Sequence, residues 1–516
     1  MIAIKNIFKT AVMVTVLSAI ERFLGFVYRI YLSRTIGAEG LGLYQIALSV
    51  LGLFMTITSS GIPITVSRML TKNKANNLMK DDSSTITSGI ITAIFLSLPI
   101  TLIVLFNEEW LSFLFTDKRC VEILRIMIPG LAFTAIYAVI RGVFWGRTQF
   151  FSYSIIELSE EAVMLIAGII LVSGVTSPMQ GAERAGYAVL ISYLFSFSVS
   201  LIVYLSRGGK FASPKKTLKP LISSSAPITA MRTSTSLINT LVSIVLPARL
   251  VSFGMESALA TAEFGKIFGM ALPMIFMPST LIGSLALVLV PELSDNYYSG
   301  KRKTLKNNVN KALNFSCFIA CMIVPVFLTL GTEISTFLYS DESVGEYIIK
   351  AAIVMLPLSI SIISTSMLNS LNKEKQTLLH FIIGAVALIL SIWFLPKYLG
   401  VNALIVGMGA NYAISSLLNV LKLRKTIGEK LAFPAYLLKS TIFIIPTSIF
   451  GVLLKNLFEK FSNDIVTIVA VGIVIAIFEL ALFGVFDMID LKKTQRKNFF
   501  NGLTSDNTGR TRKSNA

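Results

Sequence analysis

Charged residues are scarce in this chain. Asp, Glu, Lys and Arg make up 14% of its 516 residues, whereas a soluble globular protein averages about 25%. The chain has a single histidine, His380, and three cysteines. The three cysteines give no disulfide framework, and with a single histidine in the chain we expect no zinc site. We therefore expect no metal and no cofactor.

A nucleotide-binding P-loop is also missing. The stretch "RGGKFAS" (207–213) contains a Gly-Lys pair, but Tyr204 stands where the first glycine of a P-loop is required. This excludes nucleotide hydrolysis through that motif. No loop between the apolar segments exceeds about 25 residues, so we expect no soluble domain of the usual size.

Long apolar runs dominate what the chain does contain. Hydrophobic residues make up 54% of it, and runs of about 20 residues recur along its length, each long enough to cross a bilayer as a helix. We predict an all-α integral membrane protein with about 14 transmembrane helices. The predicted spans are 10–33, 44–66, 86–106, 123–145, 155–174, 185–205, 221–248, 264–290, 312–331, 348–368, 377–395, 401–421, 436–454 and 465–486.

The net charge of +18 has two readings. On a soluble protein it would suggest nucleic acid as a partner. Here the positive-inside rule explains it: with the N-terminus in the cytoplasm, inner loops hold about 30 Lys and Arg and outer loops about 8. We therefore expect a multi-pass protein of the cell membrane with both termini cytoplasmic, no nucleic-acid partner, and membrane lipids around it.

The apolar pattern suggests an internal repeat. The second and eighth spans both open with glycine-flanked apolar residues, end at a proline and lead into a basic inner loop. Six spans separate them, which predicts two six-helix halves related by an axis along the membrane normal. The predicted organisation is residues 1–215 and 216–428 for the two halves, 429–487 for two further helices, and 488–516 for a basic cytoplasmic tail.

Charges interrupt the first span in "ERFLGFVYR" (21–29). A charge at the bilayer centre costs about 2.5–3.5 kcal/mol, and such residues usually face a cavity or a partner. Arg22 and Arg29 lie about two helical turns apart, on one face with Gly25, which leaves space beside them. We expect both arginines to line a cavity, although Arg29 could instead reach the outer headgroups. Glu21 points elsewhere and is a candidate for pairing with a neighbouring helix.

Other charges within the spans extend this prediction. Arg232 and Asn239 belong to a polar stripe on the seventh span, which favours either the cavity or helix packing. Arg141 lies near the inner end of the fourth span, so snorkelling and function are both open. Glu157 and Glu161 begin the fifth span, where acids suit ion pairing, coupling or the helix dipole.

A cavity that holds several arginines attracts anions. The guanidinium group matches phosphate geometry with paired donors. The simplest substrate is therefore a phosphate- or pyrophosphate-bearing molecule that moves within the bilayer. Prolines inside several spans would let the helices bend, as alternating access requires.

Four stretches resemble a known family: "RFLGFVYRIYLSRTIGAEGLGLYQIA" (22–47), "RGVFWGRTQFFSYSIIELSEEAV" (141–163), "SSAPITA" (224–230) and "FGMALPMIFMPSTLIGSLALVLVPELS" (268–294). They are similar to the stage V sporulation protein B family. That family is a branch of the multidrug/oligosaccharidyl-lipid/polysaccharide exporter superfamily and is related to the lipid II flippases. The resemblance covers nearly the whole chain.

The resemblance implies a fold and an activity. The fold is two six-helix lobes around a central cavity, with two C-terminal helices forming a groove for a lipid tail. The implied activity is that of a flippase, which moves an undecaprenyl-pyrophosphate-linked sugar from the inner to the outer leaflet. The first candidate for this sugar is lipid II, for spore cortex peptidoglycan. Arg22 falls where lipid II flippases have a first-helix arginine, but their basic pair in the second helix has no counterpart in the uncharged stretch 54–60.

Three alternatives remain open at this point. The first two belong to the same superfamily: a flippase for O-antigen or polysaccharide repeats, and a cation-coupled drug exporter, which should have acids in its cavity. The third is a membrane enzyme acting on lipid-linked sugars, which needs positioned acids and bases or a metal. We expect a monomeric transporter and not an enzyme.

Overall fold

The computed structural model describes residues 2–76, 82–107, 112–214, 216–428, 430–458, 464–486 and 488. This part of the chain is helical throughout, without a β-strand, which confirms the predicted all-α class. The first helices are α1 (Ile2–Ser59), α2 (Ile62–Ala75), α3 (Asp82–Phe106), α5 (Arg119–Met127), α6 (Gly130–Gly146), α7 (Phe150–Val172) and α8 (Pro178–Ser206).

The chain continues through a second series of helices. These are α9 (Leu218–Ser252), α10 (Ser257–Phe264), the π-helix η2 (Gly265–Ala271), α11 (Leu272–Phe276), α12 (Ser279–Tyr298), α13 (Arg302–Tyr339), α14 (Ser343–Ala352), α15 (Met355–Ser370), α16 (Glu374–Phe394), α17 (Pro396–Leu399), the short 3-10 helix η3 (Gly400–Asn402) and α18 (Ala403–Ile427). Two further helices, α19 (Phe433–Phe458) and α20 (Asp464–Val485), follow.

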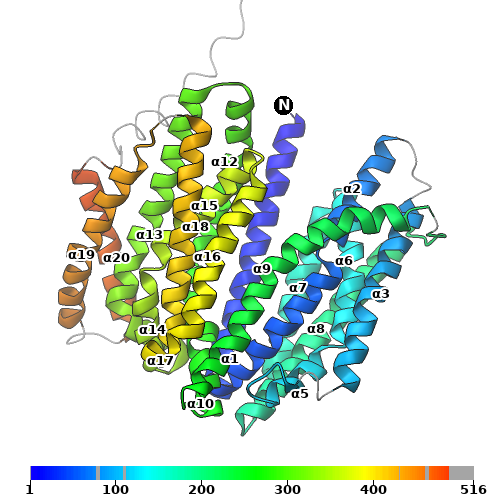
Figure 1. The fold of residues 1–516 in the computed structure, drawn as a ribbon, viewed down its shortest axis with the longest axis horizontal. Helices are drawn as coiled ribbons and strands as arrows, with labels where there is room; N and C mark the ends of the chain where they lie inside the picture. Colours follow the sequence, from blue (N-terminus) through cyan, green and yellow to red (C-terminus); the bar gives the residue numbers. More distant parts are fainter. Residues whose placement is uncertain are drawn as a thin grey trace, which may run out of the picture.

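The helices form two groups that diverge from a common end (Figure 1). We call α2, α3 and α5–α8 the N-terminal group and α12–α20 the C-terminal group; α1 and α9 lie between them. The groups meet at the end where α10 and α17 lie, which we call the closed end. They separate toward the end where the N-terminus lies. The domain boundaries after residues 215 and 428 stay predictions, and the tail after residue 488 lies outside the described residues.

Gly37 divides the long helix α1 into two arms. Its backbone has φ 71° and ψ −177°, a conformation that glycine adopts without the clash of a Cβ. The first arm runs from the N-terminus to the closed end, and the second returns toward α2 (Figure 1). The two arms therefore correspond to the first two predicted spans, 10–33 and 44–66, of which the second continues into α2.

The predicted number of spans is not confirmed. By length and apolarity, 10 helices of the described chain could cross a membrane, or 12 when each of two bent pairs is taken as one span. Two physical features separate these numbers from 14. The stretch Val12–Ala75 counts once although Gly37 breaks it, and α7 contains three glutamates that lower its apolarity.

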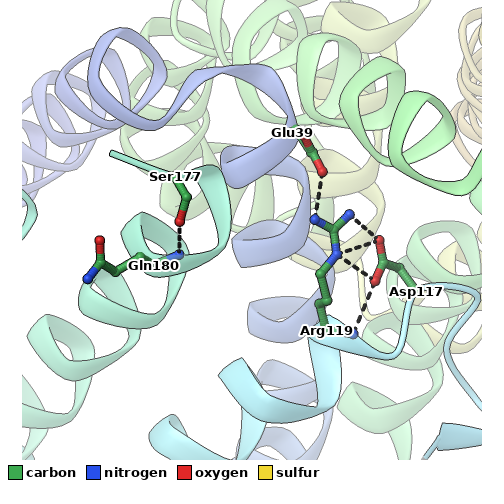
Figure 2. A network of polar contacts seen from close by, with 5 residues as sticks. All are labelled: Glu39, Asp117, Arg119, Ser177 and Gln180. Atoms are coloured by element: carbon green, nitrogen blue, oxygen red, sulfur yellow. Dashed lines mark hydrogen bonds and ion pairs between the residues drawn. The ribbon is translucent and has the colours of Figure 1, made fainter. Parts of the chain in front are cut away.

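Polar contacts hold the closed end together. Figure 2 shows Arg119, at the start of α5, between Glu39 of α1 at 2.7 Å and Asp117 at 2.7 Å. In the same view the Ser177 hydroxyl accepts a hydrogen bond from the Gln180 backbone N–H and caps α8. The Arg119–Glu39 ion pair fixes the start of α5 to α1 beside the turn at Gly37.

A second contact joins α1 to the C-terminal group. The Arg34 Nε donates to the Leu338 carbonyl at 2.7 Å, and a terminal guanidinium N–H donates to the Phe337 carbonyl. Both carbonyls lie in the last turn of α13, where the helix leaves its acceptors unpaired and favours positive charge. Arg34 therefore fastens the first arm of α1 to the C-terminal group at the closed end.

Replacing Arg34 with alanine is expected to loosen the closed end. Charge-assisted hydrogen bonds contribute about 1.5–3 kcal/mol. The population in which the two groups of helices have separated at this end should therefore increase by about tenfold or more. Thr261, 1% exposed on α10, can be replaced by cysteine as a reporter, because the native cysteines are buried. Thiol labelling at position 261 should be faster in R34A. An unchanged labelling rate would show that this contact does not hold the closed end.

Candidate functional site

A cavity of about 520 Å³ lies between elements from both series of helices. Its walls come from α1, α7 and α8 on one side and from α11 and the start of α12 on the other. The lining is mixed: apolar residues such as Phe26, Met164 and Phe276 surround a small set of charged and phenolic groups. This combination is typical of a site that orients a ligand by a few polar contacts.

Arg22 and Arg29 both line this cavity. Arg22 is exposed and Arg29 is half-buried. Among the residues that the structure describes, neither guanidinium is held in an ion pair or a hydrogen bond. Their seven-residue spacing on α1 thus presents two available cations to the same space.

A carboxylate occupies the space that Gly25 leaves beside these arginines. A Cβ atom at position 25 would lie 2.5 Å from Oε1 of Glu161 on α7. Glycine therefore permits the approach of α7 rather than leaving an empty gap. Glu161 and Glu160 line the same cavity as the arginines, so the site contains acids as well as bases.

A smaller cavity of about 110 Å³ adjoins the first, since Glu21, Glu160 and Glu161 line both. In it the Arg141 guanidinium forms an ion pair with Glu157 at 3.2 Å. The same guanidinium lies over the ring of Trp145, 5.4 Å from its centroid, a cation–π arrangement. Arg141 is thus held by partners inside the helix bundle and does not snorkel.

Arg232 and Asn239 lie elsewhere. Both are exposed on α9 and line neither cavity. Their stripe packs α9 against the second arm of α1: the Thr240 hydroxyl donates to the Ser49 carbonyl at 2.9 Å, and Thr56 donates to Ser236 at 3.3 Å. In this conformation the structure does not bring Arg232 together with Arg22.

Several cavity residues were not selected from the sequence. Tyr28, Tyr44 and Tyr193 line the larger cavity, but an aromatic residue in an apolar span gives no signal that separates a cavity wall from a core. Glu160 lines it too, but the sequence does indicate this residue, as a charge at the start of the fifth predicted span beside Glu157 and Glu161 in "ELSEEAV".

The helical segment that lines the larger cavity together with Glu160 and Glu161 is irregular. The π-helix η2 leads into α11, and Pro273 and Met277 of this region line the larger cavity. π-Helical turns frequently mark functional sites. An irregular helix beside a cavity is also a place where the wall can bend.

Tyr28 fixes the distance between α1 and α7. It is 2% exposed, and a Cβ atom at Gly168 of α7 would lie 2.3 Å from its ring. We expect Gly168→Ala to destabilise the protein by about 1–3 kcal/mol through overpacking, seen as a lower Tm in detergent. Gly52→Ala is the matched control, because a Cβ there meets nothing within 4 Å. Equal Tm values for the two variants would contradict this packing.

Sequence comparison places these residues in a family. The model of the polysaccharide biosynthesis protein family matches residues 7–296, a range that contains every residue lining the two cavities. The chain belongs to this family. Its match ends within α12, so α13 to α20 lie outside the matched range.

Two curated relatives extend the similarity beyond the family match. Stage V sporulation protein B of Bacillus subtilis (strain 168) is 24% identical over 441 residues, covering 83% of this chain and 85% of the relative. Lipid II flippase MurJ of the same organism is 22% identical over 469 residues, covering 84% and 85%. These matches confirm the resemblance to the stage V sporulation protein B family.

A solved structure supports the fold. Lipid II flippase MurJ in an inward closed conformation superposes with a TM-score of 0.70 at 16% identity, covering 93% of this chain and 100% of that one. At this identity the likeness shows the fold alone. With the apolar helices described above, it identifies the chain as a multi-pass membrane protein.

Proposed function

We propose that the protein is a flippase for a polyprenyl-pyrophosphate-linked sugar, with lipid II as the first substrate to test. The observation that supports this most is the cavity between the two series of helices, in which Arg22 and Arg29 have no ion-pair partner among the described residues. Paired guanidinium groups suit the two phosphates of such a lipid. The similarity to a stage V sporulation protein and to a lipid II flippase points to the same class of substrate.

The proposed orientation in the membrane determines which end of the helix bundle faces the cytoplasm. With both termini in the cytoplasm, as the distribution of basic residues predicts, the diverging end of the bundle faces inward (Figure 1). The closed end, with Arg34 and Arg119, then faces outward. This is the state in which a flippase would receive a headgroup from the inner leaflet.

The remaining site residues have separate roles in this proposal. Arg141, paired with Glu157, would hold the helices that line the smaller cavity in place. Glu21 and Glu161 would balance the charge of the arginines. Arg232 and Asn239, exposed on α9 in this state, would meet the headgroup as the helices move. The proposed unit is a monomer, with a cavity built from one chain and α19 and α20 near the lipid tail.

One observation favours a second candidate function. Four glutamates line the two cavities: Glu21, Glu157, Glu160 and Glu161. Cavity acids are what a cation-coupled drug exporter of the same superfamily would need. The unpaired arginines favour an anionic substrate, and an uptake assay with an organic cation separates the two candidates.

A leaflet assay tests the proposed function. Purified protein in liposomes would receive a fluorescent lipid II, with accessibility of the headgroup measured on each side and the mass of the lipid determined afterwards. The proposal expects protein-dependent movement with no change in mass. A changed mass would indicate an enzyme, and movement of neither lipid II nor another polyprenyl-pyrophosphate sugar would overturn the proposal.

A further inference from the structure

More acidic than basic residues line the two adjoining cavities. Their linings include the four glutamates named above and three arginines, Arg22, Arg29 and Arg141, which leaves one formal negative charge when all are ionised. A pyrophosphate group would add further negative charge. Like charges at close range repel each other strongly where water screens them little, so these acids oppose the ligand that the arginines attract.

Glu161 is the acid placed to compete most directly. Its carboxylate lies against Gly25, between Arg22 and Arg29 along the same face of α1, and Arg29 is the cation that attracts it. By contrast, Glu157 is held by Arg141 at 3.2 Å, and Glu160 is not among the residues that lie against Gly25. Within the described residues, Glu161 has neither an ion pair nor a hydrogen bond.

The surroundings of Glu161 come from three neighbouring helices and its own. The charged and titratable groups that line the two cavities with it, or lie next to them, are Glu21, Arg22, Tyr28, Arg29 and Tyr44 of α1, Tyr137 and Arg141 of α6, Tyr193 of α8, and Tyr153, Glu157 and Glu160 of α7. Arg141 is engaged with Glu157. The two arginines of α1 are therefore the cations available either to Glu161 or to a ligand.

Resting on the proposed function, we propose that Glu161 is an internal counter-ion that occupies the place of the substrate pyrophosphate in the empty protein. When the headgroup enters, its phosphates take over the guanidinium groups and the Glu161 side chain withdraws. When the headgroup leaves, the carboxylate returns and neutralises the arginines. Glu161 is thus a positioning residue that weakens binding and speeds release, and so allows the empty protein to return.

This role predicts opposite effects on affinity and on turnover. Glu161→Gln removes the competing charge while keeping the shape, so the affinity for the lipid-linked pyrophosphate should increase by about tenfold, the scale of one close charge pair. Transport at saturating substrate should become slower, because release and return lose their counter-ion. A merely structural role would weaken both binding and transport.

The pH dependence gives an independent readout. Protonation removes the charge of Glu161 just as glutamine does, so the wild-type affinity should rise as the pH is lowered through its titration. The E161Q variant should lack that component. The phosphates and the other acids titrate in both proteins, and the difference between the two pH profiles isolates Glu161.

A second variant acts on the position of the carboxylate and leaves its chemistry intact. Gly25→Ala places a methyl group 2.5 Å from the present position of Oε1 and pushes the flexible carboxylate away from the arginines. It should also bind the headgroup more tightly, with a smaller gain. Glu183→Gln on α8, which lines neither cavity, is the matched control and should bind as the wild type does.

The experiment is a binding titration of the full-length protein in nanodiscs with lipid II and, separately, with inorganic pyrophosphate, over a range of pH. Tighter binding and a flatter pH profile in E161Q, with the same direction in G25A, support the inference. Equal or weaker binding in both variants, beside a wild type that binds, overturns it alone. Absence of headgroup binding in the wild type and in every variant would instead overturn the proposed function.

Discussion

Replacing Arg22 or Arg29 with alanine is expected to reduce flippase activity by about 10- to 100-fold. Each arginine lines the cavity without a protein partner among the described residues, so its hydrogen bonds are available to the substrate. A hydrogen bond to a charged group contributes about 1.5–3 kcal/mol, and every 1.4 kcal/mol is about tenfold in affinity. The leaflet assay in liposomes, at equal amounts of inserted protein, measures the effect.

Two further variants show whether this loss is specific to the headgroup. Arg22→Lys keeps the charge but not the paired donors, so its activity should lie between the wild type and R22A. Arg424→Ala removes an exposed arginine in the last turn of α18, outside both cavities, and should transport normally. Wild-type rates in both R22A and R29A would remove these residues from the mechanism.

Replacing Gly42 with leucine is expected to abolish transport by a different route. A Cβ atom at position 42 would lie 2.1 Å from the Thr261 carbonyl oxygen, and one at Gly265 would lie 2.1 Å from the Ala38 carbonyl oxygen. At these two positions α1 meets α10 and η2 backbone to backbone. A leucine cannot be accommodated there by moving a flexible side chain, so the closed end could not form.

The expected result for Gly42→Leu is activity at the level of protein-free liposomes. Labelling of a cysteine at Gln45, which is 4% exposed in this structure, should become rapid. Gly52→Leu on the same helix is the control, since a Cβ at position 52 meets nothing within 4 Å. If G42L transported normally at equal insertion, closure at this end would not belong to the transport cycle.

The sequence predicted the helices well and the breaks between them less well. Apolar runs of sufficient length placed α3, α8, α13, α16 and α20 close to their observed positions, because the bilayer sets the length of a span. The break at Gly37 was predicted, because residues 34–43 lie between the first two predicted spans, but the sequence did not show that α1 would turn back at a single glycine without a longer loop.

The cavity was predictable in part. The spacing of Arg22 and Arg29 placed both on one face of α1, and both line the cavity. The partner of that face was not predictable, because the approach of Glu161 to Gly25 depends on how α7 packs on α1. Arg232 shows the limit of the same reasoning: a polar stripe on a helix indicates that something polar faces it, and here this includes Ser49 and Thr56 of α1.

The most direct test of the account is a structure of the protein with a bound polyprenyl-pyrophosphate disaccharide. We expect density for the two phosphates in the cavity between the two groups of helices, within about 3 Å of the Arg22 and Arg29 guanidinium nitrogens. The Glu161 carboxylate should have moved away from Gly25. A headgroup bound outside this cavity, with both arginines unliganded, would contradict the account.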